Sequence, residues 1–178
     1  MGHPKIDHMD VTYNDIGNYL ESVTIVLHDS TYRQAFDSLF ISTDGAWDSW
    51  DYFVHDGGER NSVSTGNVPD DGLYSVADNY TYTFATTNRT GNPNGINDDG
   101  SLTLLNGSFG ATQSGYNITY DFSNFNIILD PDSFFVAYAP WCDNDVIGGG
   151  TAPVPEPATM LLFGAGLVGL AGFGRRKK

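Results

Sequence analysis

The chain has 178 residues, with 22 Asp and Glu against 8 Lys and Arg and a formal net charge of −14 at pH 7. A chain this acidic repels nucleic-acid phosphates, so nucleic acid is not expected as a partner. Cys142 is the only cysteine, which excludes an internal disulfide. The part before the C-terminal tail, about 150 residues, is long enough for a single hydrophobic core.

The N-terminus lacks the features of a secretory signal peptide. Such a signal has a basic segment followed by about 7–15 apolar residues, whereas Met1–Asp10 reads MGHPKIDHMD. The C-terminal tail described below points to export. We therefore expect either that the natural start lies upstream of Met1 or that this chain is a fragment, and an in-frame signal peptide upstream would support this hypothesis.

The chain before the tail reads as short strands. Apolar and polar side chains alternate in 23–28, 50–55, 80–85 and 118–122, the pattern of strands with one buried face. The run 134–138 is apolar throughout, which is typical of a strand buried on both faces. No window before the tail shows a helical apolar period of about 3.6 residues.

Turns between these strands are indicated by Asp-Gly pairs, because glycine accepts positive φ and aspartate bonds its own backbone. We predict an all-β fold over residues 1–147, an antiparallel β-sandwich of jelly-roll-like type. A Gly/Pro linker is predicted at 148–153, before the tail at 154–178. The pairs are Asp44-Gly45, Asp56-Gly57, Asp71-Gly72 and Asp99-Gly100.

Carboxylates gather at short spacing in the segment that holds Asp44, Asp48 and Asp51. Ca²⁺ takes about 6–8 oxygen ligands in flexible geometry, so these three residues are candidate calcium ligands. The segment does not follow the EF-hand pattern. The alternative is that they form turns on an acidic surface.

Aromatic side chains crowd the same segment, where Trp47, Trp50 and Tyr52 lie among the carboxylates. Exposed rings beside Asp or Asn suit carbohydrate, because a ring stacks on the sugar's C–H face while the polar groups bind hydroxyls. We therefore predict a carbohydrate site at these three residues. The alternative is that they belong to the core, where strand aromatics pair across strands.

Catalytic motifs are not found, and we expect no enzyme. The sequence has no nucleophile elbow, zinc-binding His-Glu-x-x-His or phosphate-binding loop. His28-Asp29 and His55-Asp56 place an imidazole beside a carboxylate, but neighbouring strand residues point to opposite faces. A pair of glycosidase carboxylates cannot be chosen from sequence alone, so a secreted glycan-active enzyme stays the alternative.

The C-terminal tail has three parts: Val154-Pro155-Glu156-Pro157, an uncharged run from Ala158 to Gly174, and Arg175-Arg176-Lys177-Lys178. As a helix the run would rise about 26 Å, just enough to cross a membrane with help from the basic residues. The basic end would stay cytoplasmic. We predict a transmembrane helix at 158–174 that is stopped by Arg175, Arg176, Lys177 and Lys178.

This three-part order resembles the PEP-CTERM sorting signal of Gram-negative bacteria, with Pro155, Glu156 and Pro157 as the motif. The resemblance implies export, a transient stay in the inner membrane, and cleavage near Pro155–Pro157 by an exosortase, a membrane transpeptidase-like protease. Release to the cell surface or extracellular matrix would follow, often in organisms that make exopolysaccharide. An ordinary tail anchor is the alternative.

The sequence therefore predicts an exported, non-catalytic surface or matrix protein whose partners are an exosortase, the membrane and an extracellular polysaccharide. The alternatives are a secreted glycan-active enzyme and a calcium-dependent carbohydrate-binding module. No cofactor other than Ca²⁺ is indicated.

Overall fold

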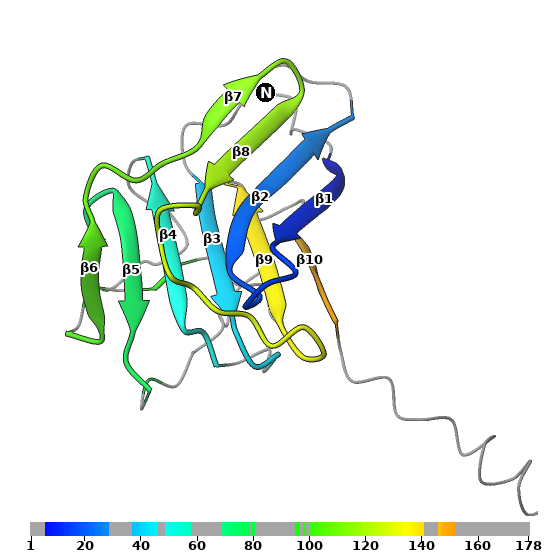
Figure 1. Cartoon of the computed structure of the whole chain (residues 1–178). Helices are drawn as coiled ribbons and strands as arrows, with labels where there is room; N and C mark the ends of the chain where they lie inside the picture. Colours follow the sequence, from blue (N-terminus) through cyan, green and yellow to red (C-terminus); the bar gives the residue numbers. More distant parts are fainter. Residues whose placement is uncertain are drawn as a thin grey trace, which may run out of the picture.

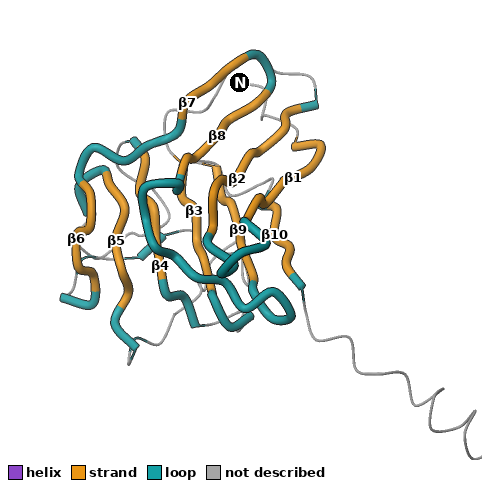
Figure 2. The backbone as a smooth tube through the Cα atoms, in the orientation of Figure 1, coloured by secondary structure: helices purple, strands orange, loops and turns teal. Residues whose placement is uncertain are grey.

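In a computed structural model the chain forms an all-β domain of two antiparallel sheets (Figure 1). The described residues contain ten strands joined by turns and loops, as Figure 2 shows, and no helix. The structure describes residues 6–28, 37–45, 49–57, 69–78, 80, 95–96, 98, 100–140 and 146–151.

The smaller sheet has four strands in the order β1-β2-β8-β7. Two hairpins form it, β1 with β2 and β7 with β8, and β2 pairs with β8 to join them. All three pairings are antiparallel. The strands are β1 (Ile6–Tyr13), β2 (Leu20–Leu27), β7 (Thr112–Ser114) and β8 (Asn117–Asp121).

The larger sheet has six strands in the order β10-β9-β3-β4-β5-β6. Consecutive strands β3 to β6 form a meander, and β9 returns beside β3 as in a Greek key. A jelly roll is built from two Greek keys, so this order does not follow the predicted jelly-roll-like type. The strands are β3 (Asp37–Ser42), β4 (Tyr52–Asp56), β5 (Gly72–Val76), β6 (Leu102–Asn106), β9 (Phe135–Pro140) and β10 (Ile147–Gly150).

The main core lies between the two sheets, which contribute alternate side chains to it. Val23, Ile25 and Leu27 of β2 are buried, as the alternation in 23–28 predicts. They share one cluster with residues of β3, β4, β5, β8 and β9, so both sheets bury a face against each other. Further members of this inter-sheet core are Leu39, Ile41, Val54, Leu73, Ile118, Tyr120, Val136 and Tyr138.

A second apolar cluster covers the other face of the six-stranded sheet. It is buried as completely as the inter-sheet core, so this sheet is apolar on both faces. Strand β9 contributes to both clusters, which confirms that the apolar run 134–138 is a strand buried on both sides. This outer cluster comprises Phe40, Trp50, Phe53, Tyr74, Val76, Ile96, Ala137 and Ala139.

The glycine run near the C-terminal tail forms a strand where the sequence suggests a linker. Gly148, Gly149 and Gly150 belong to β10 and pair with β9, with Gly150 opposite Phe135. A side chain at Gly150 would collide with the carbonyl of Phe134, so glycine permits this close approach. The folded domain therefore continues to Thr151.

Within the described ranges, no helix is long and apolar enough to cross a membrane. The predicted helix at 158–174 and the basic end at 175–178 lie outside the described residues.

Candidate functional site: the acidic turn and the start of the tail

The turn between β3 and β4 uses its carboxylates to hold its own backbone. Asp51 accepts two hydrogen bonds from Thr43 through one oxygen, Oδ2, at 2.6 Å from the backbone N–H and 2.7 Å from Oγ1. Asp44 accepts one from Ser42 Oγ at 3.0 Å. The two carboxylates thus lie on one turn and hold it by these bonds.

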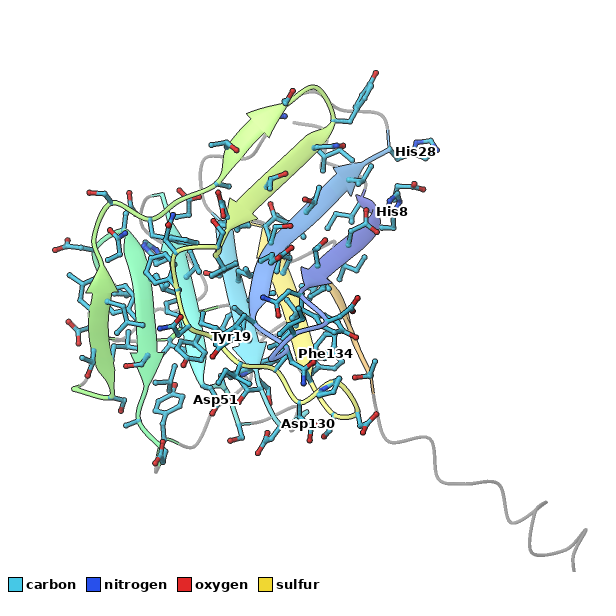
Figure 3. All side chains as sticks on the ribbon, in the orientation of Figure 1. His8, Tyr19, His28, Asp51, Asp130 and Phe134 are labelled. Carbon is cyan, nitrogen blue, oxygen red and sulfur yellow. The ribbon has the colours of Figure 1, made fainter. Side chains whose placement is uncertain are left out.

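A loop that follows Leu129 closes over this turn. The backbone N–H of Asp130 donates to the carbonyl of Thr43 at 2.9 Å, and Ser133 Oγ donates to the carbonyl of Asp44. The same loop carries Asp132, whose backbone N–H donates to Asp130 Oδ1 at 3.0 Å. Four carboxylates therefore gather at one end of the domain, where Figure 3 places Asp51 and Asp130.

The same loop also holds the last described residue. Thr151 Oγ1 donates a hydrogen bond of 2.6 Å to the carbonyl of Pro131. The point at which the chain leaves the domain is thus tied to the loop that closes the acidic turn. Sequence reasoning missed this loop, because its bonds join residues up to 89 positions apart.

The structure describes only two of the three residues predicted to bind calcium. Asp44 and Asp51 lie on the turn described above, while Asp48 lies outside the described residues. Among the described residues, no group of three or more His, Cys, Asp or Glu could hold a metal ion. A calcium site at Asp44, Asp48 and Asp51 therefore stays a prediction.

The aromatic residues predicted to bind carbohydrate lie in different environments. Trp50 is 3% exposed, and its ring centroid lies 5.3 Å from that of Phe40 and 6.2 Å from that of Phe135. Tyr52 is half-buried against the inter-sheet core, and burial, followed by the charge of Asp51, raises the pKa of its hydroxyl.

The indole of Trp50 therefore fills the outer cluster and offers no open face for a sugar ring. Trp47 lies outside the described residues. The structure does not bring Trp50 and Tyr52 together, since they pack into different clusters.

A buried histidine meets a carboxylate that the sequence indicates only as part of a turn. His55 lies on β4 opposite Gly72, and its Nδ1 is 3.2 Å from Oδ1 of Asp71. The sequence neighbour Asp56 turns away and accepts a hydrogen bond from the backbone of Ala111 at 2.6 Å, as strand geometry predicts. Pairing of β4 with β5 brings Asp71 here, and no local motif signals it.

The chain beyond Thr151 is identified by comparison with protein families. Residues 153–178 match the PEP-CTERM protein-sorting motif. This chain carries a PEP-CTERM sorting signal. No curated protein and no solved structure matches the chain. The motif implies export, processing by an exosortase, and membrane-associated sorting before placement at the surface or outside the cell.

The PEP-CTERM motif follows the folded domain almost directly. Only Ala152 separates Thr151 from the first matched residue. From Thr151 to Ala158, where the predicted apolar run starts, the chain can span at most about 25 Å. With the predicted helix at 158–174 in the membrane, the acidic end of the domain would be the end nearest to the membrane during sorting.

We expect the turn to depend strongly on Gly45. Its φ is 82°, and a Cβ there would collide with the backbone carbonyl of Ser133. Gly45→Ala should lower the free energy of unfolding by about 2–4 kcal/mol, from left-handed strain and overpacking together. Urea unfolding of the full chain measures the loss.

Gly100→Ala is the matched control, because Gly100 has a φ of 95° but no atom within 4 Å of the added Cβ. Gly100→Ala should lower the free energy of unfolding by about 1 kcal/mol, from left-handed backbone strain alone. Equal losses in the two variants would show that the contact between the turn and the loop contributes nothing.

Proposed function

We propose that this protein is an exported, non-catalytic component of the cell surface or extracellular matrix that associates with exopolysaccharide. The observation that carries the proposal is the PEP-CTERM motif at 153–178, placed directly after a folded β domain. An exosortase removes the tail near Pro155–Pro157, and the released domain is the functional product. This mode of release needs only a folded domain and a short segment between the domain and the cleavage site.

The charge of the domain limits which glycans can bind. The described residues include most carboxylates of the chain and no Lys or Arg. Such a surface repels anionic polymers and attracts divalent cations. The proposal therefore assigns a neutral glycan as the direct partner, or an acidic glycan bridged by Ca²⁺ at Asp44, Asp48 and Asp51.

A glycan array probed with the full chain, with and without Ca²⁺, tests this function. Saturable binding without turnover is the expected result, and dependence on Ca²⁺ would assign the bridging role to the cation. Release of cleaved product would replace the proposal with the glycan-active enzyme. An array that stays blank in both conditions would leave a purely structural matrix protein and refute the glycan association.

A further inference from the structure

Four strands form the edges of the two sheets in the described part of the chain: β1, β7, β10 and β6. An exposed edge presents unpaired backbone groups that can pair with another chain, and proteins usually protect it. β1 carries Asp7, His8 and Asp10, and the hydrogen bond that the His8 ring donates to Asp7 raises the pKa of His8. β7 has three residues, and β10 lies beside β1 and leads into the tail.

β6 has neither the charges of β1, the shortness of β7 nor the neighbour of β10, and its one irregularity is a β-bulge at Leu105, where its pairing with β5 shifts register. Its sequence, Leu-Thr-Leu-Leu-Asn, contains no charge and no proline, and it is the outermost strand of its sheet, as Figure 1 shows. Leu104 is 53% exposed and Leu105 is 46% exposed. The bulge interrupts the alternation of side chains here, and both leucines are exposed at the edge.

Charge favours a second copy of this chain as the partner. The domain is strongly acidic, so most contacts between two copies would bring carboxylates together and be repulsive. Residues 100–120 contain no Asp, Glu, Lys, Arg or His and include all of β6. This edge is therefore a surface on which two copies can approach without that repulsion.

We infer that β6 pairs antiparallel with β6 of a second copy about a two-fold axis, joining the two six-stranded sheets into one continuous sheet. Leu104 then lies opposite its symmetry mate, at the last regular position of β6 before the bulge. The pairing covers Leu104 and Leu105 on both copies. Because the pairing uses the β6 edge of each copy, no β6 edge remains for a third copy, and the assembly closes as a dimer.

Sedimentation of the full chain in detergent tests the interface through two charge substitutions. Leu104→Lys and Leu105→Lys each place a charge in the proposed interface and should each weaken dimerisation about tenfold or more. Ile16→Lys is the matched control, because Ile16 is 88% exposed and lies between β1 and β2. It makes the same change in charge and should dimerise like the wild type, with the tail present in every variant.

Cross-linking checks the register. Leu104→Cys in a Cys142→Ser background should form a disulfide-linked dimer on mild oxidation, since paired Cα atoms lie about 4.5–5.5 Å apart. Ile16→Cys in the same background should not. A monomeric wild type, equal association of the Leu104→Lys and Ile16→Lys variants, or equal cross-linking at the two positions would each overturn the inference.

Discussion

Replacing Trp50 with alanine is expected to lower the free energy of unfolding by about 3–5 kcal/mol. The indole is 3% exposed and lies against Phe40 and Phe135, so its removal leaves a cavity in the outer cluster. Domains are stable by about 5–15 kcal/mol, and the variant would therefore lose a large fraction of its stability. Denaturant unfolding of the full chain measures the loss.

Two comparisons separate a core role for Trp50 from a role in carbohydrate binding. Trp50→Phe keeps most of the apolar volume and should cost less than Trp50→Ala. Tyr116→Ala removes a ring that is 50% exposed and should change stability by about 0.5 kcal/mol or less. If Trp50→Ala abolished glycan binding with unchanged stability, Trp50 would be a ligand-stacking residue and its core role would be refuted.

The environment of Trp50 shows where the alternation of apolar and polar residues fails to predict which face a side chain occupies. Alternation in 50–55 puts Trp50, Tyr52 and Val54 on one face, and Tyr52 and Val54 do contact the inter-sheet core. Trp50 packs on the opposite face because β4 begins only at Tyr52. Just before the strand, Asp51 turns its carboxylate back to Thr43, which breaks the two-residue period.

Other strands were predictable because the alternation of apolar and polar side chains runs through them without a break. The alternation in 23–28 and 118–122 corresponds to β2 and β8, which pair with Ile25 opposite Ile118. Most of 80–85 lies outside the described residues, so that predicted strand stays a prediction.

Strand β10 could not be predicted, because a glycine run has no side-chain pattern and reads as a linker. The reason for glycine is visible only in the fold: the Phe134 carbonyl lies where a side chain of residue 150 would be. Likewise, the approach of Asp71 to His55 and the bond from Ser133 to Asp44 depend on which strands pair. Local sequence patterns predict individual strands, whereas the contacts of the candidate site depend on strands that pair over long sequence distances.

We expect the Pro-Glu-Pro motif to have a mechanical role, because it lies beside the folded domain. Pro155 and Pro157 oppose helix at and just before their own positions, which favours an extended segment. Replacement by alanine, the strongest helix former, would let the predicted helix at 158–174 grow back toward Thr151. Each residue that becomes helical would contribute about 1.5 Å instead of about 3.3 Å to the length of the segment between Thr151 and the membrane.

We therefore expect the triple variant Pro155→Ala, Glu156→Ala, Pro157→Ala to escape processing entirely. Intact mass spectrometry of host fractions should find the wild type cut near the motif, outside the membrane, and the variant in the membrane through Lys178. Pro153→Ala is the control, because it makes the same kind of change just outside the tripeptide and should leave processing unchanged. A triple variant cut as efficiently as the wild type would contradict the role of the tripeptide. A wild type that stays intact through Lys178 would mean that the tail is a permanent anchor, because the extended exit would then serve no protease.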